Sequence, residues 1–307
     1  MGNGFQKLRI QSFGFGYHIS QASENKFSTF AFLLFMLKYF LILSLFFSPI
    51  LCFAQKWDIG FHGGLAGYQG EINLLNPLKF NEPDFGAHVR RNLDPNFSIR
   101  LGFDQAWILG EDSKSKNPDQ IQRNLSFESS ITEASLVFEF NFFKFNPFDR
   151  QEKFSPYLMA GLGGFIYNPY TYLNGNKVFL RTVGTEGQLI PPPNRLSYYP
   201  SQYGTVSWNI PVGVGIKYHL KGNWSLNAEY GYRFTFTDYL DDIGGLYPDV
   251  TNVNPNSDLY LLSDRSVGHV FKAGDQRGDS RSFDKYFFGN VSITYTFRSL
   301  DCPKFNH

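Results

Sequence analysis

Apolar and polar residues alternate with a period of two along the chain from residue 57 onward, and no segment keeps a helical period. The clearest segment runs from Ile210 to Leu220, where aliphatic and aromatic residues alternate with Pro, Gly, Lys and His. This period places successive side chains on opposite faces of a β-strand. Eight strands are predicted, around residues 59–65, 85–89, 97–103, 136–142, 156–167, 210–220, 226–236 and 287–297.

The alternation by itself fits two kinds of protein. In a soluble β-sandwich the apolar faces meet in a core, whereas in a transmembrane barrel they meet lipid and the polar faces line the interior. The connections separate the two, because short and long ones alternate strictly. The short ones lie near residues 92–96, 144–153 and 219–223, and the long ones near 68–83, 110–125, 168–207 and 238–284.

Short turns at one end and long loops at the other are typical of an outer-membrane barrel whose termini lie in the periplasm. Aromatic residues at strand ends agree with this, because rings with a polar atom favour the headgroup level of a bilayer. They are Trp57, Trp107, Trp208, Trp224 and Tyr286. The predicted fold is therefore all-β, an eight-stranded antiparallel transmembrane outer-membrane β-barrel with short periplasmic turns and long extracellular loops. Its lumen is expected to be filled by side chains rather than to conduct.

The N-terminal region predicts export. Residues 36–54 have the layout of a secretory signal peptide, with Lys38 ahead of an apolar stretch that is shorter than the roughly 20 residues of a membrane-spanning helix. We expect cleavage after Ala54, which leaves residues 55–307 as a single barrel domain with its strands within about 57–297. Residues 1–35 are interpreted as a leader or an over-extended start, which leaves open whether the chain begins at Met1 or Met36.

Charge and cysteine content narrow the function further. Lys plus Arg number 28 and Asp plus Glu 27, so the formal charge of +1 gives no support for nucleic-acid binding. Aromatic residues make up 18% of the chain, which suits the half-buried faces of strands. The two cysteines, Cys52 and Cys302, cannot form a disulfide scaffold. Lipidation of Cys52 is disfavoured because Leu51 precedes it, where a small residue is expected.

Charged residues recur on the face predicted to line the interior. Their signs nearly cancel, so we expect a packed network of ion pairs, because an unpaired buried charge is costly. The predicted interior polar network comprises Asp58, His62, His88, Arg90, Arg100, Asp104, Glu139, Lys217, Glu229 and Arg233. An acid–base site at His62 or His88 is the alternative, but neither lies in a recognisable nucleophile motif. We therefore predict no enzyme activity and no cofactor.

Carboxylates also cluster at Asp238, Asp241 and Asp242, after the seventh predicted strand. Their spacing does not match an EF-hand loop, which has alternating oxygen ligands and a late Glu. A role in ordering the loop is favoured, and no metal site is predicted.

Several blocks of the chain resemble the PorG-like outer-membrane barrel proteins of the type IX secretion system of Bacteroidota. The resemblance extends over residues 57–297. Its blocks lie at residues 68–71 (YQGE), 184–188 (GTEGQ), 210–218 (IPVGVGIKY), 229–242 (EYGYRFTFTDYLDD) with Tyr247, 263–266 (SDRS), 277–278 (RG) with Tyr286, and 295–297 (YTF). The loop residues that carry the motif are Gly184, Thr185, Glu186, Gly187, Asp238, Tyr239, Asp241 and Asp242.

The resemblance implies a non-enzymatic part of the type IX protein secretion machinery. Its implied partners are outer-membrane lipid and the periplasmic lipoprotein and ring proteins of that machinery. A surface-binding, adhesive or structural small barrel is the alternative, because two of the predicted loops have about 40 residues or more.

Overall fold

The computed structural model describes residues 56–73, 76, 78–146, 152–279 and 282–297. The predicted signal peptide, its cleavage site and both cysteines lie outside these residues. Eight long strands form the main sheet. They are β1 (Lys56–Gln69), β2 (Glu82–Asn92), β3 (Phe97–Glu111), β4 (Ser126–Asn141), β5 (Phe154–Tyr167), β8 (Val206–Lys221), β9 (Trp224–Thr235) and β10 (Lys285–Phe297).

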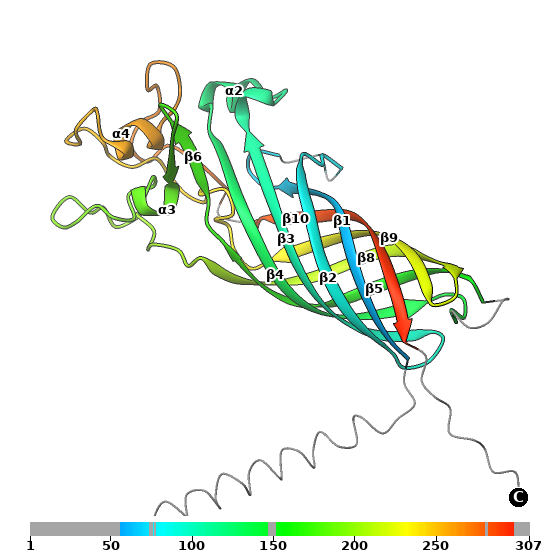
Figure 1. The fold of residues 1–307 in the computed structure, drawn as a ribbon. Helices are drawn as coiled ribbons and strands as arrows, with labels where there is room; N and C mark the ends of the chain where they lie inside the picture. The colour runs from blue at the N-terminus through cyan, green and yellow to red at the C-terminus, as the bar shows by residue number, and fades with distance from the viewer. Residues whose placement is uncertain (1–55, 74–75, 77, 147–151, 280–281, 298–307) are drawn as a thin grey trace, which may run out of the picture. The chain divides into compact units, whose positions relative to one another are not determined.

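The sheet closes into a barrel (Figure 1). Neighbouring strands pair antiparallel in the order β3-β2-β1-β10-β9-β8-β5-β4, and β3 also pairs with β4. The first and last strands are neighbours, with Trp57 opposite Phe297. Closure leaves none of the eight strands with an open edge, and an open edge in hydrocarbon would leave backbone groups without partners. The predicted eight-stranded antiparallel outer-membrane barrel is confirmed.

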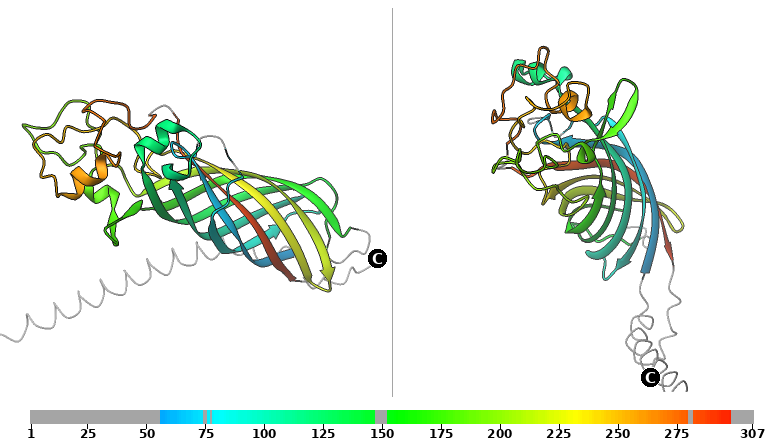
Figure 2. Two further views of the ribbon diagram at one scale, coloured as in Figure 1. Left: turned by 90° about the horizontal axis from the view of Figure 1, so that it is seen from above. Right: turned by 90° about the vertical axis from the view of Figure 1, so that its left-hand side faces the viewer.

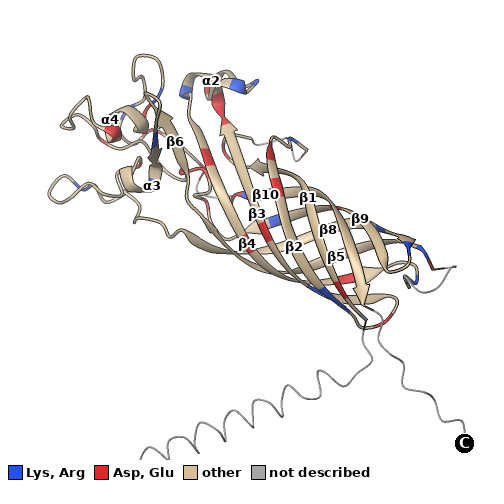
Figure 3. Ribbon diagram, viewed as in Figure 1, with Lys and Arg blue, Asp and Glu red and all other residues tan. Residues whose placement is uncertain are grey.

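The exposure of side chains separates the barrel from a sandwich. Phe61, Leu101 and Leu162 lie on the outer wall and are 64%, 59% and 67% exposed. Glu139 and Lys217 point inward and are at most 1% exposed. Along the strands, a few charged positions separate long stretches of uncharged residues (Figure 3). An apolar exterior and a charged interior are the reverse of the distribution in a soluble protein, and they fit a lipid environment.

Near the long loops this polarity reverses. On β4, the outward side chains change from Leu136 and Phe138 to Ser130 and Glu128, while Phe127 and Ile131 turn inward. The inward apolar residues join a buried core at this end of the barrel. Its members include Tyr68, Ile108, Phe127, Ile131, Phe165, Tyr167, Leu240, Ile243, Tyr286 and Phe288. This end therefore has the pattern of a water-exposed protein, and we call the core and the loops around it the loop cap.

The loop cap contains short elements within three of the four long connections (Figures 1 and 2). They are η1 (Asp112–Lys114), α2 (Pro118–Arg123), β6 (Tyr170–Leu173), β7 (Asn176–Phe179), α3 (Leu180–Val183) and α4 (Asp258–Ser263). These connections were predicted to be loops, so the β6–β7 hairpin corrects that prediction. Its turn, Asn174–Gly175, has positive φ at both residues, and an Asn-Gly pair between apolar runs is a strong hairpin signal.

No helix within the described residues is long and apolar enough to cross a membrane. All four tryptophans lie toward the ends of strands, Trp57 and Trp224 near the short turns and Trp107 and Trp208 near the long loops. Tyr286 does not belong to this belt, because its side chain is fully buried and faces the interior. The reason is register: Tyr286 stands opposite Tyr68 and Arg233, both of which face inward.

Candidate functional site

The interior near the short turns is organised around Glu139 on β4. Its carboxylate lies 2.9 Å from Arg90 Nε, 3.1 Å from Arg100 Nε and 2.6 Å from Lys217 Nζ. Arg90 also contacts Asp58, at 3.4 Å. These side chains come from five different strands, because inward positions at the same height face one another across a narrow barrel. Charge is thus compensated within the lumen.

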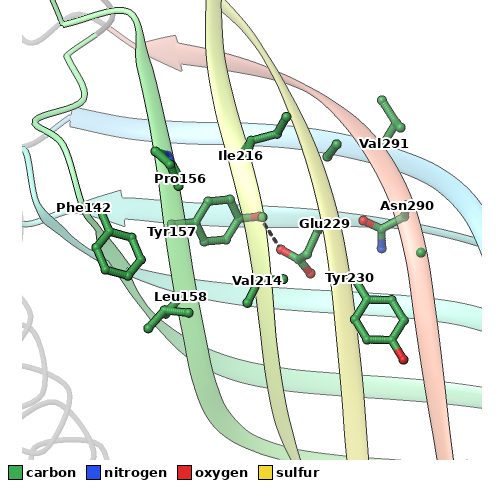
Figure 4. Close-up of a pocket in the computed structure, with 13 residues that line it drawn as sticks. Phe142, Pro156, Tyr157, Leu158, Val214, Ile216, Glu229, Tyr230, Asn290 and Val291 are labelled. Atoms are coloured by element: carbon green, nitrogen blue, oxygen red, sulfur yellow. Dashed lines mark hydrogen bonds between the residues drawn. The ribbon is translucent and has the colours of Figure 1, made fainter. Parts of the chain in front are cut away.

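The next layer pairs Arg100 with Glu229, at 2.7 Å. Tyr157 of β5 donates a hydrogen bond to the same carboxylate, at 2.6 Å, and Figure 4 shows its ring lying across β8 to reach Glu229 on β9. Gly215 on β8 permits this crossing, because a Cβ atom there would come within 2.5 Å of the Tyr157 ring. The outward residues in the same view, Leu158 and Val291, line the lipid-facing wall.

Two histidines occupy the middle of the lumen. His62 Nε2 lies 3.0 Å from Asp104 and 4.0 Å from Asp84, and its ring centroid is 6.4 Å from that of His88. The cavity beside them, which Arg233 also lines, measures about 20 Å³. That is room for about one water molecule. No larger group fits beside the two rings in this cavity.

Closer to the loop cap than the histidines, the Glu133 carboxylate accepts hydrogen bonds from Tyr286 OH at 2.5 Å and from Asn209 Nδ2 at 3.0 Å. Arg233 Nε lies 3.5 Å from the same carboxylate. The structure thus places all ten residues of the predicted network inside the barrel. Sequence reasoning missed Glu133, because β4 begins ten residues before the predicted strand. In residues 126–132 the inward positions include Phe127 and Ile131 and the outward positions are polar, so the alternation leading up to Glu133 opposes that of the rest of the strand.

In the loop cap, Glu186 and Asp242 surround Arg277. Glu186 Oε1 accepts hydrogen bonds from the backbone N–H groups of Gly244 and Gly245 and from Arg277 Nη1, each at 3.0 Å. Arg277 also donates to the carbonyl oxygen of Asp242, at 2.5 Å. All three side chains are nearly inaccessible to solvent. One buried guanidinium group therefore joins the connection before β8 to two parts of the β9–β10 connection.

The Asp242 carboxylate accepts hydrogen bonds from Thr185 Oγ1 and from Tyr203 OH, the latter at 2.6 Å. Burial raises the pKa of Asp242 to about 6, against the opposing effect of the Arg277 charge. Tyr239 stacks on Tyr203 with the ring centroids 4.6 Å apart. The residue at 187 must be small and tolerate a positive φ, because a Cβ atom on Gly187 would lie 2.9 Å from the Tyr199 ring.

Four more carboxylates gather beside this network, at Glu71, Asp238, Asp241 and Asp284. Tyr68 OH donates to Asp241 Oδ2 at 2.5 Å and to Asp284 Oδ1 at 3.1 Å. Burial and the neighbouring Asp241 charge raise the pKa of Asp238 to about 8. Burial and the Asp238 charge raise the pKa of Glu71 to about 7. The four residues therefore form a buried cluster of carboxyl groups that hold their protons more tightly than exposed ones do.

The motif residues predicted for the loops thus lie together: Thr185, Glu186 and Asp242 around Arg277, and Asp238 and Asp241 in the carboxylate cluster. Gly184 ends α3 with a positive φ. Glu71 and Arg277 were predicted only as members of the motif blocks, and Tyr203 and Asp284 were not predicted. Asp284 directly precedes β10, and an acidic residue at a strand end carries no signal of its own.

Three of the solved structures that this chain resembles in fold are outer-membrane proteins of other bacteria. The Yersinia pestis attachment invasion locus protein Ail, in complex with the heparin analogue sucrose octasulfate, is 12% identical, with a TM-score of 0.37 and coverage of 80% of this chain and 100% of that chain. A major outer membrane protein from Thermus thermophilus is 12% identical, with a TM-score of 0.36 and coverage of 80% and 100%. The N-terminal β-barrel domain of Pseudomonas aeruginosa OprF is 10% identical, with a TM-score of 0.35 and coverage of 79% and 97%.

No curated protein matches the sequence significantly. A family described as "Domain of unknown function (DUF6089)" matches residues 37–183, which include β1 to β5 and the β6–β7 hairpin. Because its strands form a closed ladder with an apolar exterior, the chain has the fold of an outer-membrane β-barrel, and its residues 37–183 match the DUF6089 family.

Proposed function

We propose that this protein is a non-enzymatic outer-membrane component of the type IX protein secretion machinery that associates with the periplasmic ring of that machinery. One observation carries the proposal. Blocks that resemble the PorG-like family are far apart in the sequence, yet they contact one another in the loop cap. Glu186 in the block at 184–188 accepts a hydrogen bond from Arg277 in the block at 277–278. Tyr68 in the block at 68–71 donates a hydrogen bond to Asp241 in the block at 229–242.

The interior supports a role as a scaffold. Ion pairs cross the lumen at several heights, and Glu139 alone joins three cations from three strands. A lumen filled in this way by the described residues leaves no continuous passage for a folded or unfolded polypeptide, so the barrel would act through its surfaces. Two surfaces lie beyond the lipid-facing wall, one at each end of the barrel: the short turns and the loop cap.

The short turns are the surface through which we propose contact with the periplasmic ring. The β2–β3 turn is rigid, because Asp94 Oδ1 accepts the backbone N–H groups of Asn96 and Phe97 at 2.7 and 2.9 Å. Leu93 in this turn and Phe143 after β4 are exposed apolar residues, 46% and 58% accessible. Exposed apolar residues beside a membrane surface favour binding to another protein.

Site-specific crosslinking tests this surface. A photo-crosslinking amino acid at Leu93 is expected to form an adduct with a periplasmic ring protein, whereas the same group at Val267 in the loop cap serves as the matched control. Val267 is 92% exposed and belongs to the opposite end of the barrel. Adducts with ring proteins from Val267 but none from Leu93 would contradict the proposal.

Gene deletion tests the role itself. The deletion strain is expected to lose export of type IX substrates while its outer membrane stays intact. Complementation with the intact protein should restore export. Normal export in the deletion strain would exclude the function.

A surface-binding role is the second candidate, favoured by a groove in the loop cap. Tyr198, Tyr239, Leu246 and Gly278 are among the residues that line it, so it offers two rings and open backbone to a ligand. Tyr198→Ala is the corresponding test, because Tyr198 is 39% exposed. Loss of surface adhesion with normal export would favour this role over the first.

A further inference from the structure

The carboxylate cluster of the loop cap brings three segments together at one point. Glu71 follows β1, Asp238 follows β9 and Asp284 precedes β10. One carboxylate oxygen from each of these residues lies within 4.8 Å of the corresponding oxygens of the other two. All three side chains are buried, at 6%, 9% and 0% exposed. Three carboxyl oxygens thus converge from different loops in a site that water barely reaches.

Unlike Glu186, Asp242 and Asp112 in the loop cap, this cluster has no cationic partner among the residues that the structure describes. Glu186 and Asp242 share Arg277, and Asp112 pairs with Arg123 at 2.7 Å. Arg123 does approach the cluster, but there it donates a hydrogen bond to the backbone carbonyl oxygen of Glu71 and not to a carboxylate of the cluster. The negative charge of Glu71, Asp238 and Asp284 is therefore uncompensated by any described Lys or Arg at ion-pair distance.

Two oxygen atoms in the cluster have no hydrogen-bond partner in the described part of the protein. They are Glu71 Oε2 and Asp238 Oδ1, and both are buried. A buried polar atom normally has a hydrogen-bond or metal partner, so each of these two oxygens is expected to have one. Both belong to the group of three carboxylates whose oxygens converge. Together with the missing countercharge, they indicate a bound cation.

The surrounding groups hold the carboxylates in place. The Asp284 carboxylate accepts Tyr68 OH and the backbone N–H of Leu240, the latter at 2.9 Å. Asp241 is held by Tyr68 and by the N–H of Ile243, at 2.9 Å. Gly70 leaves the necessary space, because a Cβ atom there would lie 2.0 Å from both Asp284 Oδ1 and Tyr68 OH. The oxygens are thus oriented before any ion arrives.

The chemistry of the donors selects the ion. All of them are oxygens, which suit hard divalent cations, and no sulfur or imidazole belongs to the group. Calcium binds oxygen at about 2.3–2.6 Å, so oxygens on opposite sides of the ion are separated by about 5 Å. The observed spacing falls within that limit. Magnesium requires shorter bonds and a stricter octahedral arrangement.

We propose that Glu71, Asp238 and Asp284 bind one Ca²⁺ ion, with Asp241 and Tyr68 as positioning residues. The ion joins the connection after β1 to both ends of the β9–β10 connection. It therefore fastens the loop cap across the β1–β10 seam of the barrel. This inference does not depend on the proposed role in secretion.

Terbium luminescence measures the site directly in the full-length protein purified from membranes in detergent. Tb³⁺ replaces Ca²⁺ at oxygen sites, and the Tyr68 ring lies close enough to sensitise it. We expect saturation near one equivalent of Tb³⁺ and competitive displacement by Ca²⁺. The double variant Glu71→Gln/Asp238→Asn should weaken Tb³⁺ binding by about tenfold or more, because ligand charge sets affinity. Asp119→Asn, at an exposed carboxylate on α2, is the matched control and should bind as the wild type does.

Thermal unfolding distinguishes an ion site from a purely structural cluster. In Ca²⁺ the wild type should be more stable than the double variant, and in EGTA the order should reverse, because the variant lacks the mutual repulsion of the carboxylates. Unheated gel mobility verifies that the double variant is a folded barrel, and Asp284→Asn provides a second, single-site variant. Equal destabilisation in Ca²⁺ and in EGTA, or undiminished Tb³⁺ binding by both variants, overturns the proposal.

Discussion

At the residue scale, the interior depends on a few carboxylates that each serve several cations. Glu139 contacts Arg90, Arg100 and Lys217; Glu139, Arg90 and Lys217 are buried, and the Arg100 side chain is 11% exposed. A buried ion pair adds little net stability when complete, because desolvation offsets the attraction. Its removal is costly, because the partner charges stay buried without compensation. The same logic applies to Arg277 in the loop cap, which serves Glu186 and Asp242.

Glu139→Gln is therefore expected to destabilise the barrel by about 3–5 kcal/mol, because it leaves three buried cations undercompensated. Urea unfolding in detergent micelles, followed by tryptophan fluorescence, measures the change. Glu152→Gln, outside the strands and only half-buried, is the control and should change stability by about 0.5 kcal/mol at most. Equal stability of the two variants would show that Glu139 does not hold the lumen together.

Arg277→Ala is expected to open the loop cap without unfolding the barrel. The side chain donates to Glu186 and to the carbonyl oxygens of Asp242 and Ser263, and these contacts join the connection before β8 to the β9–β10 connection. Limited proteolysis should cut the β9–β10 connection faster than in the wild type, while the mobility of the unheated protein on a gel stays that of a folded barrel. An unchanged cleavage rate would contradict this role for Arg277.

At the element scale, β4 passes through two environments. Its part near the short turns carries Leu136 and Phe138 on the outer wall, and its part near the loops carries Ser130 and Glu128 there. Ser130 stands opposite Trp107, one of the tryptophans near the long loops. We infer that the lipid boundary crosses β4 at about this height, since tryptophan favours the interface.

A matched pair of arginine substitutions on β4 tests the position of this boundary. Leu136→Arg is expected to cost about 2–4 kcal/mol, because its outward side chain would lie in hydrocarbon, and Ser130→Arg about 0–1 kcal/mol. Equilibrium unfolding in lipid vesicles measures both. Similar costs for the two substitutions would place the two residues in the same environment.

At the scale of the whole molecule, one chain combines a lipid-facing barrel with a core of the water-soluble kind. Hydrogen bonds run continuously around the eight-stranded ladder, which makes the barrel hard to open. The loop cap depends instead on side-chain bonds between loops. We therefore regard the barrel as the rigid support and the loop cap and short turns as the surfaces that bind other molecules.

This organisation predicts the behaviour of the purified protein. It should require detergent to remain dispersed, because its outer wall exposes many large apolar side chains. It should also migrate differently on a denaturing gel before and after boiling, since the closed ladder survives the detergent without heat. A monomeric, soluble protein in the absence of detergent would contradict the assignment of the outer wall to lipid.

The strands of the barrel were predictable because the alternation of apolar and polar residues in each strand can be read from neighbouring positions in the sequence. Ile210 to Leu220 alternates without interruption, and the same holds for the last strand. Prediction failed where the environment changes along one strand. Residues 126–132 of β4 place Phe127 and Ile131 inward and polar groups outward, and they were assigned to no strand. Segment 156–167 appeared apolar on both faces because inward Phe165 and Tyr167 belong to the core of the loop cap.

The amino-acid sequence by itself determined the number of barrel strands, the alternation of short and long connections and most of the charges that enter the lumen, Glu133 being the exception. These follow from periodicity, which depends on neighbours in the chain. Only the tertiary structure decided which charges meet, that Arg277 lies between Glu186 and Asp242, and that Glu71 and Asp284 converge with Asp238. Those contacts depend on strand register and on barrel closure, which bring together residues far apart in the chain, and no local pattern encodes them.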